Sequence, residues 1–418
     1  MATGPRTARQ VLAGAVAIGA LAGLAPSAAA QLPPAAQPDP PGPPEPPPPS
    51  SGRLKAPRLI ATGVPIPLRG SRATPGARVT VQIRRSGRWR PIAARRADRL
   101  GRYRLRVRPR RTARRHRLRA LVAGAVPSRA VRVGSRDVTL DAVGDINLGD
   151  GVATVMYQRG YRYPWGGVAR HLRSADLAFG NLECAVSRRG SAAPGKQYTF
   201  RGRPAALRVA ARYAGMDVLS LANNHAEDFG KAALADTLKW IRRFGMTGVG
   251  AGHDLAAARR PRVVKRLGLR IAFVGFSDVN PPGFGAGPGT PGTVLATPGL
   301  VRRDTRRAAR RADVVVATFH WGVERSATPN ARQRQLARAA LAGGADAVIG
   351  AHPHVLQPVE RSGRRVVAYS LGNFVWAAGS PFTARTGILR LRLSRRGVEG
   401  ARLRRAYISD ARPALLRR

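Results

Sequence analysis

The sequence predicts an α/β domain preceded by a small all-β domain of the Ig-like sandwich type, and three observations support this fold class. From residue 136 to about residue 412, short apolar runs alternate with helical stretches, as in buried strands joined by crossover helices. Residues 53–135 instead alternate apolar and polar residues with a period of two, and turn signals separate the runs. A proline-rich stretch, residues 31–52, precedes both and marks a linker.

Residues 1–30 are typical of an export signal. Arg6 and Arg9 precede the apolar run VLAGAVAIGALAGLA, and residues 28–30 are the small residues of a cleavage site. The run is short for a transmembrane helix, although an uncleaved anchor is the alternative. The prolines of residues 31–52 predict an extended, semi-rigid spacer. We therefore expect an exported protein that is extracellular or associated with the cell envelope.

The composition is strongly basic, with 73 Lys and Arg against 22 Asp and Glu and a formal net charge of +51. Only five of these basic residues are lysine, so part of the charge reflects a compositional bias towards arginine. Such a charge nevertheless favours an anionic partner. Cys184 is the single cysteine, which excludes an intramolecular disulfide, and we expect it to be buried.

Residues 53–135 hold 25 basic residues and one acid, Asp98. Their apolar runs, RVTVQIRR, RYRLRV, RLRALV and AVRV, predict short strands. A solvated face of arginines is one interpretation of the charge. The other is binding to an anionic surface polymer, a cell-wall component or acidic lipid. Nucleic acid is disfavoured, because an export signal precedes the domain and aromatic residues are few.

The α/β domain alternates strands and helices along its length. The strand candidates are DVTLDAVGD, DLAFGNLE, DVLSLANNH, RIAFVGFSD, DVVVATFHWG, DAVIGAHPH and RVVAYSLGNF. The helix candidates are PAALRVAARYAG, GKAALADTLKWIRRFG, RRDTRRAARRA and NARQRQLARAALAGG, and several have glycine at or just past the end. The alternating segment at residues 387–408 predicts a closing hairpin.

Polar side chains follow five of these apolar runs directly. They are Asp145, Asn181, Glu183, Asn223, Asn224, His225, His320, His352 and His354. Because ligands bind beyond the carboxyl ends of strands in α/β sheets, we expect these side chains to form one site. Carboxylates, amide oxygens and imidazoles together suit one or two divalent ions, Mn, Fe, Zn or Mg, and hydrolytic chemistry. Glu183 is the candidate bridging ligand.

Single motifs leave other interpretations open. The Gly144-Asp145 pair is also compatible with a helix N-cap, and GNLE with a turn that has Asn181 in a left-handed conformation. His320 in FHWG could be a core histidine beside Trp321. The GAHPH segment, with His352 and His354, is the strongest signal, and the combination of all five strand ends favours the metal site.

Seven motifs in order, GDI, GNLE, YTFRG, LANNH, FHWG, GAHPH and YSLGNF, resemble the bacterial poly-γ-glutamate capsule synthesis (CapA-type) family over about residues 138–411. That family is placed with the calcineurin-like metallophosphoesterases, so the resemblance implies a four-layer sandwich of two mixed sheets flanked by helices. It implies Asp145 and His354 at a first metal, Glu183 as the bridge, and Asn224, His320 and His352 at a second. It also implies His225 and Asp145 as catalytic residues and Arg201, Asn223, Ser370 and Asn373 as substrate-binding residues.

Two positions depart from the phosphoesterase pattern. Asn147 stands where the first motif usually has a histidine ligand, and Ala226, followed by Glu227, stands where an Asp usually follows the histidine of the third motif. The resemblance implies an exported metal-dependent hydrolase in the synthesis or processing of an anionic surface polymer, with other capsule-synthesis proteins as partners. A non-catalytic polymer-binding or assembly subunit and a secreted nucleotidase or phosphodiesterase are the alternatives.

Overall fold

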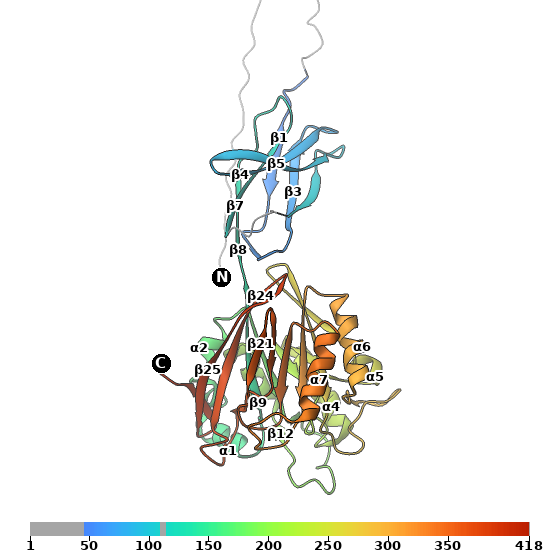
Figure 1. Ribbon diagram of the computed structural model, residues 1–418, viewed down its shortest axis with the longest axis vertical. Coiled ribbons are helices and arrows are strands. Elements are labelled where there is room, and N and C mark those ends of the chain that lie inside the picture. The colour runs from blue at the N-terminus through green and yellow to red at the C-terminus, as the bar shows by residue number, and fades with distance from the viewer. Residues whose placement is uncertain (1–45, 109–113, 418) are drawn as a thin grey trace, which may run out of the picture. The chain divides into compact units, whose positions relative to one another are not determined.

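The computed structural model describes residues 46–108 and 114–417 (Figure 1). The predicted export signal and residues 31–45 of the proline-rich linker lie outside the described residues. None of the helices within the described ranges is long and apolar enough to cross a membrane.

The small β domain consists of two sheets around one apolar core. The three-stranded sheet has the order β1-β3-β6, and the five-stranded sheet has the order β2-β8-β7-β4-β5. The strands are β1 Ser51–Lys55, β2 Leu59–Ala61, β3 Ile66–Ala73, β4 Arg78–Arg85, β5 Arg88–Arg96, β6 Tyr103–Val107, β7 Arg115–Leu121 and β8 Val131–Arg136. The alternation read from RVTVQIRR is confirmed, because Val79, Val81 and Ile83 of β4 are buried between polar neighbours.

The α/β domain contains two mixed sheets. The eight-stranded sheet has the order β14-β13-β10-β9-β24-β25-β26, with β23 also paired to β9. Its strands are β9 Val138–Ile146, β10 Leu177–Leu182, β13 Val218–Ser220, β14 Thr247–Val249, β23 Asn373–Val375, β24 Arg385–Ser394, β25 Gly397–Ser409 and β26 Arg412–Leu415. The antiparallel pair β24 and β25 is the predicted closing hairpin.

The six-stranded sheet has the order β16-β17-β19-β20-β22-β21. Its strands are β16 Arg262–Arg266, β17 Leu269–Ser277, β19 Val314–His320, β20 Ala347–Ala351, β21 Val359–Ser362 and β22 Arg365–Ala368. The four central strands are parallel. Two short two-residue pairings, β11 Ala185–Val186 with β12 Arg201–Gly202 and β15 Ala251–Gly252 with β18 Gly292–Thr293, lie outside both sheets.

Successive residues of a strand point to opposite faces of its sheet, so one strand contributes to the core between the sheets and to the core under the outer helices. On β9, Leu140 and Ala142 join Phe273 of β17 in a core between the sheets, where the Phe179 and Phe273 rings stack 5.9 Å apart. Val143 and Ile146 face the other way, towards helices on the outer side. Helix, sheet, sheet and helix therefore follow one another through the α/β domain (Figure 1).

Helices cover the outer faces of the two sheets. They are α1 Asp150–Arg159, α2 Ala169–Leu172, α3 Pro204–Val209, α4 Gly230–Arg243, α5 Leu255–Ala258, α6 Pro298–Ala309 and α7 Ala331–Ala342. Helices α4, α6 and α7 confirm three predicted helices. The fourth candidate, residues 204–215, is divided into α3 and a π-helical turn, Ala210–Ala214, which ends at Gly215 with a φ of 81°.

Candidate metal centre

The site lies where five parallel strands of the two sheets end. Asp145 is the penultimate residue of β9, and Glu183 directly follows β10. On the other sheet, His320 is the last residue of β19 and His352 follows β20. Contacts between these groups, such as Asn181 Nδ2 to His320 Nδ1 at 3.3 Å, show that the structure brings the two sheet edges together.

The turn after β20 carries two histidines with an uncommon backbone. His352 has a φ of 96° and His354 a φ of 58°, with Pro353 between them. Residues with a side chain rarely adopt positive φ, and such strain is concentrated at functional sites. The turn lets two side chains from one short segment reach two different ligand groups.

Asp145, Glu183 and His354 form the first ligand group, with one donor atom from each within 4.8 Å of the others. His354 Nδ1 lies 3.1 Å from Asp145 Oδ2 and 2.9 Å from Asn373 Oδ1. Since these oxygens accept the Nδ1 hydrogen, Nε2, which is 3.8 Å from Glu183 Oε1, is the nitrogen of His354 that would bind a metal. Burial favours a higher pKa for Asp145, but His354 and the amide of Asn181 hold that pKa below its ordinary value.

Glu183, His320 and His352 form the second group within the same 4.8 Å limit, so Glu183 is shared. Glu183 Oε1 and His352 Nδ1 are buried and have no hydrogen-bond partner among the described residues. Buried polar atoms without partners are rare, and they are the atoms that a metal ion would bind. Burial and Asp145 raise the pKa of Glu183 well above its ordinary value. Burial lowers the pKa of His352 to about 3, so its imidazole is neutral, as metal binding requires.

Two asparagines connect the ligands. Asn181 donates from Nδ2 to Asp145 Oδ1 at 2.9 Å and to Glu183 Oε2 at 3.2 Å. Asn224, a predicted ligand, places its Oδ1 2.8 Å from His320 Nε2, beside the second group. The donor set of carboxylate, amide oxygen and neutral imidazole is compatible with divalent metal ions.

Asn147, which occupies the position of the missing first-motif histidine, has a local role. Its Oδ1 accepts a hydrogen bond from the Gly149 N–H at 2.8 Å, and its own N–H donates to the Val375 carbonyl at 2.9 Å. The side chain closes a turn after β9 and does not supply a ligand in place of the histidine. The first group therefore has three candidate ligands, Asp145, Glu183 and His354. The second group has Glu183, His320 and His352, and Asn224 lies beside it.

A carboxylate that the sequence pattern did not reveal supports His225. Asp228 is fully buried, and its Oδ2 lies 2.7 Å from His225 Nδ1. Asp228 also contacts Lys196, whose Nζ lies 3.1 Å from the same nitrogen of His225. Ala226 stands where an Asp usually follows this histidine, but the loop turns back and places the carboxylate of Asp228, three residues after His225, beside the imidazole.

The four residues predicted to bind substrate are placed differently. Asn223 and Ser370 are fully buried, and their side chains hold the loops, Asn223 by donating to the Leu182 carbonyl at 2.8 Å and Ser370 by accepting from Gly372 at 3.1 Å. Asn373 contacts His354, as described above. Arg201 is exposed, donates to the Gly190 carbonyl at 3.1 Å and lies 4.1 Å from the centre of the Phe229 ring.

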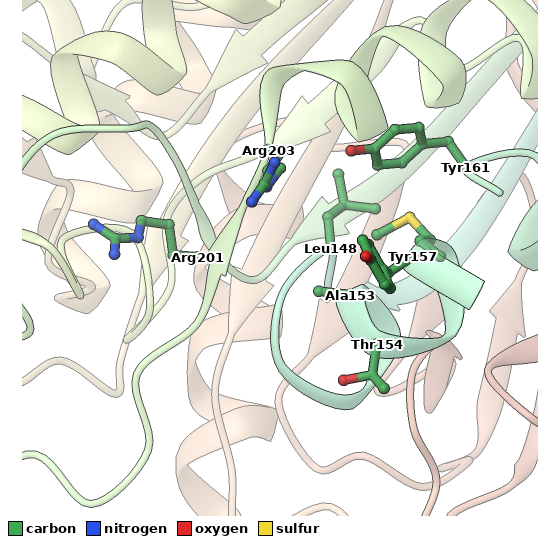
Figure 2. A pocket seen from close by; sticks show the side chains of 8 residues that line it. Leu148, Ala153, Thr154, Tyr157, Tyr161, Arg201 and Arg203 are labelled. Atoms are coloured by element: carbon green, nitrogen blue, oxygen red, sulfur yellow. The ribbon is translucent and has the colours of Figure 1, made fainter. Parts of the chain in front are cut away.

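Arg201 also lines a pocket along α1, together with Leu148, Thr154, Tyr157, Tyr161 and Arg203 (Figure 2). In this view its guanidinium points away from the two tyrosines. Aromatic rings cover the His225 side of the centre: Phe200 stacks on His225 at 4.3 Å, and Trp376 lies 5.5 Å from Phe200 and 4.7 Å from His354.

The fold and the site define the class as an α/β protein with a strand-end centre compatible with divalent metal ions. The chain belongs to the family described as bacterial capsule synthesis protein PGA_cap, whose profile matches residues 139–378. The family expected from the seven motifs is thereby confirmed.

Named relatives agree with this family. The chain is 35% identical over 295 residues to the PGA biosynthesis protein CapA of Bacillus subtilis, covering 70% of this chain and 77% of that protein. It is 31% identical over 267 residues to the capsule biosynthesis protein CapA of Bacillus anthracis, covering 62% of this chain and 65% of that protein. Among solved structures, the NAD nucleotidase of Haemophilus influenzae shares 11% identity at a TM-score of 0.38, covering 67% and 60%. A TM-score this low supports no conclusion.

Proposed function

We propose that this chain is an exported, envelope-associated hydrolase of the metallophosphoesterase type that acts in the synthesis or processing of an anionic polymer of the poly-γ-glutamate kind. The observation that supports metal dependence most directly is a pair of buried atoms, Glu183 Oε1 and His352 Nδ1, that form no hydrogen bond within the part of the chain that the structure describes. The names of the Bacillus relatives support the polymer.

Each residue of the centre has a separate task in this proposal. Asp145, Glu183, Asn224, His320, His352 and His354 would hold one or two divalent ions, which lower the pKa of bound water and bind an anionic oxygen of the substrate. His225 would give a proton to the leaving group from Nε2, because Nδ1 faces Asp228. Asp228 holds the orientation of this ring, and Phe200 and Trp376 limit access of water from their side.

Metal analysis combined with a substrate panel tests the proposal. The panel contains phosphomonoesters, phosphodiesters, nucleotides and γ-glutamyl amides, each with the purified full chain and added Mn²⁺, Zn²⁺ or Mg²⁺. In His352→Ala we expect metal content to fall and turnover to drop by more than the roughly 10–100-fold that loss of a supporting residue costs. His253→Ala, an exposed histidine outside the centre, is the matched control. Undiminished metal content and turnover in His352→Ala would contradict the proposal, and turnover of nucleotides alone would redefine the substrate.

A non-catalytic role as a polymer-binding or assembly subunit is the second candidate. The turn formed by Asn147 favours it, because the first ligand group then lacks the usual histidine. Under this alternative the purified chain binds polymer or other capsule-synthesis proteins but turns over no substrate of the panel with any of the three metals. Metal-dependent turnover of a single substrate would exclude it.

A further inference from the structure

The outer face of the five-stranded sheet in the small β domain concentrates positive charge. Residues that alternate with buried ones, such as Val81 of β4 and Leu118 of β7, point outward. We call the outward set the arginine face, and it consists of Arg78, Arg84, Arg96, Arg115, Arg117, Arg119 and Arg132.

Several of these arginines lie directly opposite one another. Arg117 of β7 pairs in register with Arg132 of β8, and Arg78 of β4 pairs with Arg96 of β5. Like charges at such positions destabilise a sheet. Arg119 donates to Gln82 Oε1 at 2.7 Å and Arg96 donates to the Gly76 carbonyl at 3.0 Å, but no residue of the arginine face forms an ion pair with a carboxylate of the described chain.

The compositional bias of the chain does not account for this arrangement. The α/β domain is also rich in arginine, and there part of the arginines form ion pairs with carboxylates, as in Arg390 with Asp141 and Arg259 with Asp304. The residues of the arginine face instead have no carboxylate partner within the described chain. A sheet face that retains opposed cations is explained if a polyanion neutralises them.

We propose that the arginine face binds a polymer that carries a carboxylate on each repeating unit. A planar guanidinium can donate two parallel hydrogen bonds to one carboxylate, in a bidentate pair. Neighbouring strands are about 4.8 Å apart and alternate residues of one strand about 6.8 Å apart, so the face is a grid of cation sites that an extended chain can follow. The identity of the polymer rests on the proposed function, which is directed at a polymer of this class.

The face is less suited to the other polyanions. Single-stranded nucleic acid needs exposed aromatic rings for stacking, and the aromatic residue on this face, Trp89, is half-buried, with Arg119 4.4 Å from its ring centre. Membrane docking combines cations with apolar side chains that insert into lipid. The large apolar residues that the domain exposes, Leu100 and Val126, lie in loops outside the strands of the arginine face.

Binding measurements with the full chain and purified poly-γ-glutamate test this inference. One variant combines Arg84→Gln, Arg117→Gln and Arg132→Gln. A second combines Lys55→Gln, Arg69→Gln and Arg104→Gln, which lie in register across the three-stranded sheet and remove the same charge. We expect the first variant to bind at least about 10-fold more weakly, because three charge-assisted contacts are lost, and the second to bind nearly as the parent chain does.

Equal weakening in both variants would show that net charge, and not this face, attracts the polymer. Tighter binding to phosphatidylglycerol vesicles or to duplex DNA than to poly-γ-glutamate would also overturn the inference. His352→Ala separates it from the proposed function, since this variant should lose turnover but keep the part of polymer binding that Arg84, Arg117 and Arg132 contribute. If the parent chain turns over substrate but does not bind polymer, the inference about the face fails alone. If it binds polymer but shows no turnover, the proposed hydrolase fails alone.

Discussion

The small β domain and the α/β domain share one arginine-rich composition, yet they use arginine differently. Residues 53–135 contain 25 basic residues and one acid, whereas residues 136–418 contain 46 basic and 19 acidic residues. In the α/β domain arginines join strands and helices through carboxylates, for example Arg390 on β24 with Asp141 on β9. Among residues 53–108 and 114–135, the structure contains no ion pair. Part of the arginines of the α/β domain therefore support the fold through carboxylates, whereas those described among residues 53–135 have no such partner.

The largest effect that separates the domains is expected at the metal centre. Glu183→Gln keeps the size of the side chain but removes the charge of the shared ligand, so metal content should fall to near zero and turnover by more than about 1,000-fold, as expected when metal activation of water is lost. Binding of poly-γ-glutamate should be unchanged, which polymer-binding assays measure alongside metal analysis. Full metal content in this variant would show that Glu183 is not a metal ligand.

The next effect concerns an arginine that the fold needs. Arg390→Met leaves the fully buried Asp141 with only His171 Nε2, 3.4 Å away, so unfolding free energy should fall by about 3–5 kcal/mol. Urea denaturation measures this loss of unfolding free energy. Arg392→Met, on the same strand, removes an exposed pair with Asp137 and should cost less than about 1 kcal/mol. Equal losses in the two variants would mean that burial of the pair does not matter.

A smaller effect on turnover is expected at Asp228, the carboxylate beside His225. Asp228→Asn removes the charge beside His225 Nδ1 and Lys196, so turnover should fall by about 100-fold, the lower end of what general acid–base catalysis contributes. Metal content should be retained, which distinguishes lost proton transfer from collapse of the centre. Asp236→Asn, whose carboxylate pairs with the exposed Arg189, serves as control. Unchanged turnover in Asp228→Asn would exclude a proton-transfer role supported by this carboxylate.

The smallest effect lies on the arginine face. Arg117→Gln relieves its opposition to Arg132 and should raise the unfolding free energy by about 0.2–1 kcal/mol at low salt. Because the charges are exposed, the gain should vanish near 1 M salt. Arg129→Gln, in a loop, should give no such gain. Destabilisation by Arg117→Gln at low salt would mean that the opposed arginines are satisfied within the domain, and the comparison between the two domains would no longer hold.

Much of the α/β fold could be predicted from the sequence because its strands are short apolar runs and its longer helices have clear ends. The strand-end polar residues also predicted which side chains the structure brings together in the candidate site, since parallel strands deliver their last residues to one edge. Helix α1 was not predicted, because it buries only Val152 and Met156 and has little apolar periodicity.

The side-chain contacts within the site could not be predicted from sequence patterns. Lys196 lies 29 residues before His225, and only the folded loop brings them together. Asp228 could have been found by asking which carboxylate lies within one turn of the histidine, without requiring the neighbouring position. That Asn147 closes a turn depends on the Gly149 N–H, whose direction no spacing reveals.

The pairing of β9 with β24 has a consequence for the order of events during synthesis. β9 is the first strand of the α/β domain and carries Asp145, yet its antiparallel partner is β24, with Ala142 opposite Leu389. Such distant pairing must wait until nearly the whole chain has emerged. The strand that carries Asp145 thus depends on a partner from the end of the chain, so a chain interrupted before Arg385 should hold no metal.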